Sequence, residues 1–182
     1  MKLITNDLDL EYRVYRSDTI VKHHEVIMAE INQALFVFKN EFDDRDPTWS
    51  YKFYNTFNLT APSIYFYNLF NELKTVVREY AGHDRPLWIQ SWINCHMPDQ
   101  VLDWHNHRWP FHGYISLDPK LSRTVFEEYA INNKIGNIYI GPGNRLHKVE
   151  VLETFYTPRI TLGIDVTDQP GAPSGRFSLI PI

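Results

Sequence analysis

The stretch Trp88-Ile89-Gln90-Ser91-Trp92-Ile93-Asn94-Cys95 marks the point at which the spacing of hydrophobic residues changes from a helical repeat to a strand repeat. Before it, apolar residues recur every three or four positions, and from Pro86 onward they tend to alternate with polar ones. Alternation with a period of two is typical of strands that bury one face. The sequence therefore predicts a helical first half and a strand-rich second half.

Further short segments downstream show the same strand pattern, and turn-forming Pro, Gly, Asn and Asp residues separate them. These segments are residues 101–107, 113–117, 123–130, 137–140, 146–152, 159–166 and 176–180. About eight antiparallel strands at this spacing are typical of a double-sheet jelly roll or a barrel. We therefore expect a mainly β fold with N-terminal helices.

The first half of the chain predicts two helices packed on one outer face of this sheet structure. Residues 1–16 alternate loosely and predict one strand, and a cap at Ser17-Asp18 opens a helix over about 18–39. Residues 40–60 predict an ordered loop, and Pro62 opens a second helix that ends at Gly82. Because no clear linker follows, we expect a single domain over 1–182, with helical support over about 1–85 and a jelly-roll core over about 86–182.

Composition narrows the classes of function. The net charge of -4 and the pI near 6.0 provide no general basic field, which disfavours nucleic acid as a partner. A single cysteine, Cys95, rules out an internal disulfide and a cysteine-only metal site, so a reducing, cytoplasmic location is expected. No apolar run approaches the roughly 18 residues of a membrane span, and no membrane association is expected.

Three histidines in the strand-rich half are the candidates for metal binding. His105 and His107 are two residues apart, so on a strand they would share a face at a spacing of about 7 Å. His147 follows on a later predicted strand, and Arg159 lies twelve residues beyond it. Three imidazoles that leave coordination positions open suit a catalytic iron, zinc, copper or nickel ion.

The order of motifs in this half resembles the 2-oxoglutarate and iron(II)-dependent oxygenases, and within them the prolyl-hydroxylase-like and uncharacterised phage-type members. The resemblance covers about residues 88–168, and its most specific part is a distal His followed about a dozen residues later by Arg-x-Thr. The segments that carry it are Trp92-Ile93-Asn94, the His105 and His107 pair, residues 111–117, 136–140 and 146–149, and Pro158-Arg159-Ile160-Thr161-Leu162-Gly163-Ile164.

The resemblance implies a double-stranded β-helix that holds Fe(II) and takes 2-oxoglutarate as co-substrate, in an oxygenase of hydroxylase type. It implies His105 as the first metal ligand and His147 as the distal one. Arg159 would pair with the far carboxylate of 2-oxoglutarate, and Thr161 would hydrogen-bond to the same group. Tyr114 and Asn94 would line the co-substrate pocket, and the substrate would be a small molecule or a peptide.

One departure from the family pattern concerns the second ligand. The family carries His-x-Asp or His-x-Glu, whereas this chain has His107 in the carboxylate position. An imidazole is neutral, so a three-histidine site would leave the metal one charge more positive. Asp103 shares the predicted strand face of His105, and it is the alternative source of the carboxylate.

Other functions also agree with parts of the pattern. A cupin-like metalloprotein would use the three histidines without 2-oxoglutarate, but it would not need Arg159. A non-catalytic relic of the oxygenase fold would account for the missing carboxylate, but not for the pairing of His147 with Arg159. The letters His-Asn-His also suggest a nuclease, which would need a ββα unit and a basic surface that this sequence lacks.

Overall fold

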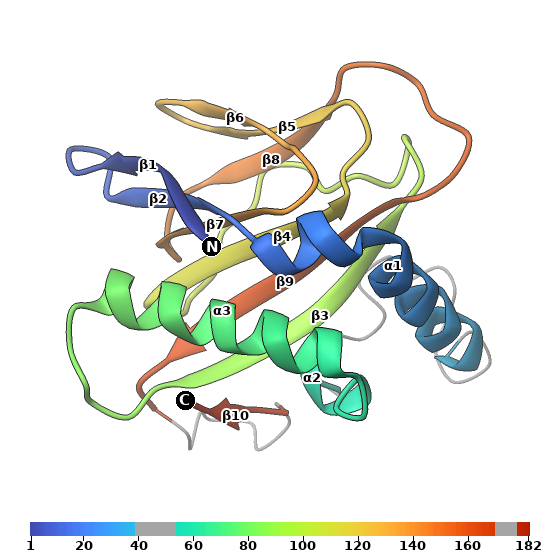
Figure 1. Cartoon of the computed structure of the whole chain (residues 1–182). Helices are drawn as coiled ribbons and strands as arrows, with labels where there is room; N and C mark the ends of the chain where they lie inside the picture. The colour runs from blue at the N-terminus through green and yellow to red at the C-terminus, as the bar shows by residue number, and fades with distance from the viewer. Residues whose placement is uncertain (39–53, 170–177) are drawn as a thin grey trace.

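Two antiparallel sheets and three helices make up the computed structural model, which describes residues 1–38, 54–169 and 178–182 (Figure 1). The larger sheet has the strand order β1-β2-β7-β4-β9-β3-β10, and the smaller has the order β6-β5-β8. The strands of the larger sheet, in that order, are Lys2–Asp7, Tyr12–Arg16, Asn137–Pro142, Phe111–Asp118, Arg159–Thr167, Trp88–His96 and Ile180–Pro181. Those of the smaller sheet are Ala130–Asn132, Ser122–Phe126 and His147–Val151. The predicted fold class, mainly β with a jelly-roll arrangement, is confirmed.

The helices cover one face of the larger sheet, as Figure 1 shows. They are α1 (Asp18–Phe38), α2 (Thr56–Leu59) and α3 (Ile64–Ala81). Apolar residues from α1 and α3 form one buried cluster with those of the central strands β3, β4, β7 and β9. No helix in the described ranges has the length and apolar character needed to cross a membrane.

Strand β9 shows how alternation separates the core from the opposite face of the sheet. Its residues at even positions, from Ile160 to Val166, pack in the cluster beneath the helices. Since successive side chains point to opposite faces, the odd positions Arg159, Thr161, Gly163 and Asp165 face the smaller sheet. The polar and small side chains of this buried strand therefore gather in the space between the two sheets.

Helix α1 begins at the predicted cap, and α3 helps to hold that end. The Ser17 hydroxyl accepts a hydrogen bond from the Ile20 N–H at 3.0 Å and donates to the Glu72 carboxylate of α3 at 2.5 Å. The same carboxylate accepts from the Thr19 N–H at 3.1 Å and from the Thr19 hydroxyl at 2.9 Å. An acceptor with negative charge is favourable here because the N-terminus of a helix carries partial positive charge.

Replacing Glu72 with alanine is expected to lower the free energy of unfolding by about 2 kcal/mol, because buried donors at the start of α1 lose a charged acceptor. Urea denaturation monitored by circular dichroism measures the change. Glu25→Ala is the matched control, since Glu25 lies exposed on α1, and it should change the free energy of unfolding by less than about 0.5 kcal/mol. Equal effects of the two substitutions would contradict the role given to Glu72.

Several predicted elements differ from the structure. Residues 1–16 form a hairpin of two strands, β1 and β2, and β2 pairs with β7 of the core. The segment 123–130 contains most of β5 and the first residue of β6, and residues 127–129 separate the two strands. Within the predicted loop 40–60, the described part includes the short helix α2, whereas residues 39–53 lie outside the described residues. Of the predicted strand 176–180, residues 176 and 177 also lie outside them, and only residue 180 belongs to a strand, β10.

The most consequential correction concerns residues 101–107, which do not form a strand. Their only ladder contact in the described structure is an isolated bridge between His105 and His147. Local hydrogen bonds compete with strand pairing here, because the Asp103 carboxylate accepts from the Trp104 N–H at 2.8 Å. The segment nevertheless lies beside β8, since reciprocal backbone hydrogen bonds of 2.9 Å join His105 and His147.

Candidate functional site

A cavity of about 220 Å³ between the two sheets is the candidate functional site. Strands β3, β4 and β9 provide one wall, and β5, β8 and the segment from Leu102 to His107 provide the other. The structure brings together in this cavity the seven residues predicted as metal ligands or co-substrate contacts, whereas Asp103, the alternative ligand, is not part of its lining. The seven residues are Asn94, His105, His107, Tyr114, His147, Arg159 and Thr161.

Three imidazoles converge at one end of the cavity. One ring nitrogen from each of His105, His107 and His147 lies within 4.8 Å of the others. The rings of His105 and His147 have centroids 4.3 Å apart, and that of His107 lies 5.5 Å from each of them. Three nitrogens this close together form a ligand set of the size that a single transition-metal ion needs.

The other ring nitrogen of each of these histidines faces a hydrogen-bond acceptor. Nδ1 of His105 lies 2.6 Å from the Asp103 carbonyl, and Nδ1 of His147 lies 2.9 Å from the Arg145 carbonyl. A carbonyl only accepts, so each Nδ1 carries the hydrogen and each Nε2 keeps its lone pair. The partner of His107 Nδ1 is the Asp165 carboxylate, at 3.0 Å.

Nε2 of His107 is buried and has no hydrogen-bond partner in the part of the chain that the structure describes. A buried lone pair without a partner is costly unless a ligand occupies it. A histidine that binds a metal usually donates its other ring N–H to a carbonyl or carboxylate, which fixes the orientation of the ring and leaves the second nitrogen free for the metal. The three residues therefore fit a divalent metal of the kind that imidazole prefers.

Burial also keeps these rings in the form that binds metal. Burial, together with the neighbouring rings, lowers the pKa of His147 to about 2. Burial likewise lowers the pKa of His105, although its hydrogen bond to the Asp103 carbonyl opposes the shift. Both imidazoles are thus neutral at pH 7, with lone pairs available to a metal.

The structure places His107, rather than Asp103, beside the other two ligand candidates. Asp103 is exposed and its carboxylate binds the backbone N–H of Trp104, so it does not join the group of converging atoms. The expectation that Asp103 shares a strand face with His105 fails because this segment is not a strand. His107 is held instead by its backbone N–H, which donates to the Gly143 carbonyl at 2.8 Å.

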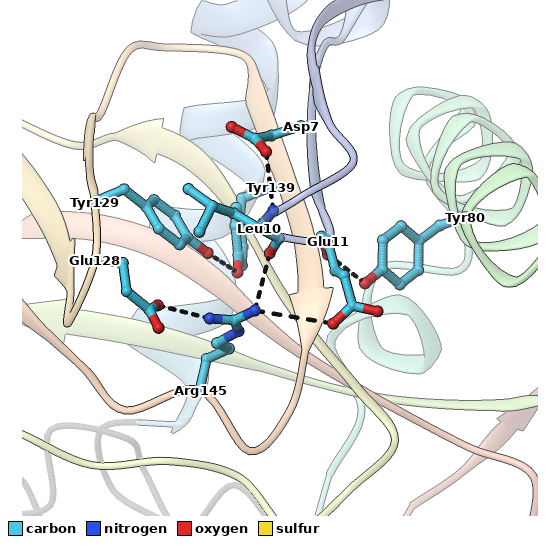
Figure 2. Close-up of polar contacts among 8 residues, drawn as sticks. All are labelled: Asp7, Leu10, Glu11, Tyr80, Glu128, Tyr129, Tyr139 and Arg145. Atoms are coloured by element: carbon cyan, nitrogen blue, oxygen red, sulfur yellow. Dashed lines mark hydrogen bonds and ion pairs between the residues drawn. The ribbon is translucent and has the colours of Figure 1, made fainter.

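The backbone that supports His147 is anchored by the side chain of Arg145. Figure 2 shows this guanidinium between two segments, with Glu128 at 2.6 Å and the Leu10 carbonyl at 3.3 Å. The Glu11 carboxylate lies 3.8 Å away on the same side as Leu10. The hairpin turn between β1 and β2 and the turn after β5 thus hold the residue whose carbonyl orients His147.

A buried guanidinium lies in the same cavity as the imidazoles. Arg159 is 3% exposed, and burial lowers its pKa to about 10, so it stays charged at neutral pH. Its partners among the described residues are hydroxyls, Ser122 Oγ and Thr161 Oγ1, each at 3.3 Å. No carboxylate of the described chain pairs with it, and three of its five N–H donors have no partner there.

The hydroxyl of Thr161 is oriented by its own partners. Its oxygen accepts from Arg159 Nη1 and from Asn94 Nδ2, both at 3.3 Å, so its hydrogen remains available to a ligand. Asn94 is held in turn by Trp92, whose Nε1 donates to the Asn94 Oδ1 at 3.0 Å. The indole ring of Trp92, from β3, can pack against β9 only because residue 163 is glycine, since an added Cβ there would be 2.2 Å from the ring.

Tyr114 is the remaining predicted residue, and it projects from β4 into the buried lining of the cavity. Burial raises the pKa of its phenol well above the ordinary value, so it is neutral. Of the other aromatic residues near the predicted motifs, Trp104 is 43% exposed beneath the Lys148 ammonium, and Tyr139 packs in a separate buried cluster. Neither lines the cavity.

Sequence reasoning did not identify Asp165 as part of this site. The Asp165 carboxylate is 3% exposed and lies 3.0 Å from His107 Nδ1 and 3.1 Å from His112 Nδ1. Burial favours a higher pKa, but these two hydrogen bonds hold the pKa of Asp165 below its ordinary value. The signal was present as an acid within the apolar run 160–166, an even number of positions from Arg159.

Comparison with solved structures finds proteins of similar fold, and oxygenases are among them. The α-ketoglutarate-dependent carbocyclase SnoK from nogalamycin biosynthesis has a TM-score of 0.61 at 12% identity, over 94% of this chain and 89% of that chain. A putative oxygenase from Shewanella oneidensis has a TM-score of 0.56 at 13% identity, over 89% of this chain and 85% of that one. IDO from Bacillus thuringiensis has a TM-score of 0.51 at 8% identity, over 86% of this chain and 92% of that chain.

No family model matches the sequence, and a search of curated proteins finds no match. At the identities of the solved structures the likeness concerns the fold, which is the one that the resemblance to 2-oxoglutarate and iron(II)-dependent oxygenases implied. The fold that the resemblance implied is therefore confirmed. The narrower assignment to prolyl-hydroxylase-like or phage-type members stays a prediction.

Proposed function

We propose that this chain is an iron(II)- and 2-oxoglutarate-dependent oxygenase of hydroxylase type. The observation that supports this most is the content of one cavity, where three converging imidazoles share the space with a buried guanidinium that lacks an acidic partner among the described residues. A cation ligand and an anion ligand are both needed to satisfy such a cavity. Fe(II) and a keto acid with a free carboxylate meet these two needs.

The case for a carboxylate ligand depends on the cost of burying charge. A buried charge without a partner is strongly unfavourable, and a carboxylate paired to a guanidinium by two parallel hydrogen bonds relieves it. Arg159 and the oriented Thr161 hydroxyl lie next to each other on β9 and offer donors to the same anion. We therefore assign to these two residues the far carboxylate of 2-oxoglutarate.

The remaining residues have distinct roles in this proposal. Nε2 atoms of His105, His107 and His147 would hold the iron, which when bound supplies oxidation of a substrate C–H bond by O2, coupled to conversion of 2-oxoglutarate to succinate and CO2. Asn94 orients Thr161, while Trp92 and Tyr114 exclude water from the buried wall. The substrate would be a small molecule or a peptide, and the net charge of -4 favours a neutral or cationic substrate over a polyanion.

A cupin-like metalloprotein without 2-oxoglutarate is the alternative, and Arg159 distinguishes the two. Such a protein would use the histidines but would leave the buried guanidinium unexplained. A relic of the fold would explain neither the convergence of the three imidazoles nor the buried guanidinium. The proposal can therefore be tested on metal and co-substrate binding before any substrate is known.

The test is an anaerobic titration of the purified chain with Fe(II), with and without 2-oxoglutarate, followed by visible absorption. We expect a weak charge-transfer band that requires both ligands, and succinate formation when O2 is admitted. Iron binding without the band would overturn the proposal in favour of the cupin-like protein. Absence of iron binding would overturn it in favour of the relic.

A further inference from the structure

We propose that Asp165 is a positioning residue for the metal, which supplies from behind His107 the negative charge that the ligand set itself lacks. This inference rests on the proposed function only in requiring a divalent metal at the three histidines. It assigns a role to a residue that lies outside the His-x-His motif, on the strand that also carries Arg159.

The geometry joins one carboxylate to two imidazoles. Asp165 Oδ1 lies 3.0 Å from His107 Nδ1 and 3.1 Å from His112 Nδ1, and Oδ2 lies 3.3 Å from the former. The two rings stack with centroids 3.7 Å apart and planes 11° apart, so both present Nδ1 to the same oxygen. Each Nδ1–H that donates to Asp165 leaves the Nε2 of that ring without a hydrogen.

The strand register explains why Asp165 reaches both rings. Asp165 is paired with His112 across the β4 and β9 ladder, so their side chains lie side by side on the face toward the smaller sheet. His107 arrives from the segment beside β8 and covers His112. The contact between Asp165 and His107 thus depends on three parts of the chain that are distant in sequence.

The charges of the buried residues point to a cation. Asp165 pairs with no lysine or arginine in the described chain, and its partners there are the two imidazoles. Arg159, on the same strand face, pairs with no acid there. Buried charges of opposite sign that do not meet each other are satisfied together when a cation binds near Asp165 and an anion binds near Arg159.

The Asp165 carboxylate compensates for the absence of a carboxylate ligand at position 107. A carboxylate ligand would neutralise one charge of a divalent metal directly, whereas a neutral imidazole does not. When the imidazole donates its Nδ1–H to a buried carboxylate, its Nε2 becomes a stronger donor to the metal. The pair of His107 and Asp165 therefore takes over part of the role of a carboxylate ligand.

The same atoms permit a competing arrangement, in which the metal lies among His107, His112 and Asp165. The partnerless Nε2 of His107 favours the first arrangement, because a metal held with His105 and His147 would give this buried nitrogen a partner while Nδ1 keeps its contact with Asp165. The two arrangements differ in what His112 does. It is a ligand in the second, and in the first it only holds the carboxylate.

The first test is a titration with Co(II) alone, whose visible absorption reports both affinity and ligand geometry. Asp165→Asn is expected to lower Co(II) affinity by roughly 10-fold to 100-fold and to shift the absorption bands. Asp168→Asn is the matched control, an exposed acid just beyond the end of β9, and it should leave both unchanged. Affinity and bands of Asp165→Asn equal to those of the unsubstituted chain would overturn the inference.

Two further measurements keep the test decisive if Asp165→Asn folds poorly. In the unsubstituted protein loaded with Zn(II), nitrogen-15 NMR of the histidine rings should show Nε2 of His107 bound to metal and a hydrogen on its Nδ1. Metal on Nδ1 would overturn the inference. Likewise, His112→Phe should retain Co(II) binding with lowered affinity, and complete loss would favour the competing arrangement.

Failure of this inference can be told apart from failure of the proposed function. If the unsubstituted chain binds Co(II) and Fe(II) but Asp165→Asn binds equally well, only the role of Asp165 is wrong. If the unsubstituted chain binds neither metal, the proposed oxygenase is wrong as well.

Discussion

Replacing Arg159 with alanine is expected to weaken binding of 2-oxoglutarate to the iron-loaded protein by roughly 100-fold to 4000-fold. Removing one partner of a buried charge pair costs about 3–5 kcal/mol, and each 1.4 kcal/mol is about tenfold in affinity. Arg159 is nearly inaccessible to water, so solvent would not replace its hydrogen bonds to the carboxylate. The visible band of the ternary complex, titrated with 2-oxoglutarate under anaerobic conditions, measures the loss.

Iron affinity in the absence of 2-oxoglutarate should stay within about twofold in Arg159→Ala, because this residue is not among the converging nitrogens. The 2-oxoglutarate affinity of Arg159→Lys should lie between that of Arg159→Ala and that of the unsubstituted chain. The lysine ammonium keeps the positive charge but lacks the planar guanidinium that forms two parallel hydrogen bonds. The control is Arg123→Ala on β5, where the arginine forms a partly exposed ion pair with Glu150. Unchanged 2-oxoglutarate affinity in Arg159→Ala would refute the assigned carboxylate site.

Replacing His147 with alanine is expected to lower Fe(II) affinity by more than roughly 100-fold. Loss of a residue that hydrogen-bonds to a metal ligand typically lowers metal affinity by roughly 10-fold to 100-fold. Loss of one of the three ligands themselves should lower it further. His147 is also the residue through which β8 pairs with the segment carrying His105, but this pairing uses backbone atoms that alanine retains. The substitution should therefore affect the metal far more than the fold.

Isothermal titration with Fe(II) under anaerobic conditions measures the effect, and thermal unfolding without metal checks the fold. His23→Ala is the matched control, because this histidine is exposed on α1 and its ring lies at a tilt beside that of Tyr65, and neither residue lines the cavity. We expect His23→Ala to bind iron like the unsubstituted chain. Comparable iron affinity in His147→Ala would show that the three imidazoles do not form the metal site.

Predictions made from periodicity agreed best with the structure where a single element buries one face. The predicted helix over 18–39 corresponds to α1 (Asp18–Phe38), and the second predicted helix to α3 (Ile64–Ala81) with its left-handed cap at Gly82. Strands β3 and β9 also lie where alternation placed them. In each case the spacing of apolar residues within the segment itself predicts which face is buried, so the prediction does not depend on contacts with distant residues.

Prediction failed where contacts with distant parts of the chain determine the backbone conformation of a segment. Residues 101–107 have a strand-like pattern, but their local hydrogen bonds and a single bridge to β8 produce an irregular segment instead. Residues 1–16 form two strands because β7 offers an edge to β2. Neither the missing ladder nor the available edge can be seen in the segment itself.

The sequence by itself determined the two long helices, the strands β3 and β9, and the candidates His105, His107, His147, Arg159 and Thr161, because each belongs to a local pattern or a short motif. Tertiary structure alone decided that these five residues line one cavity and that His107 rather than Asp103 joins the other histidines. It also placed Asp165 behind His107, on the evidence of a ladder between β4 and β9. The physical reason is that convergence of side chains depends on strand register and sheet packing, which sequence spacing leaves undetermined.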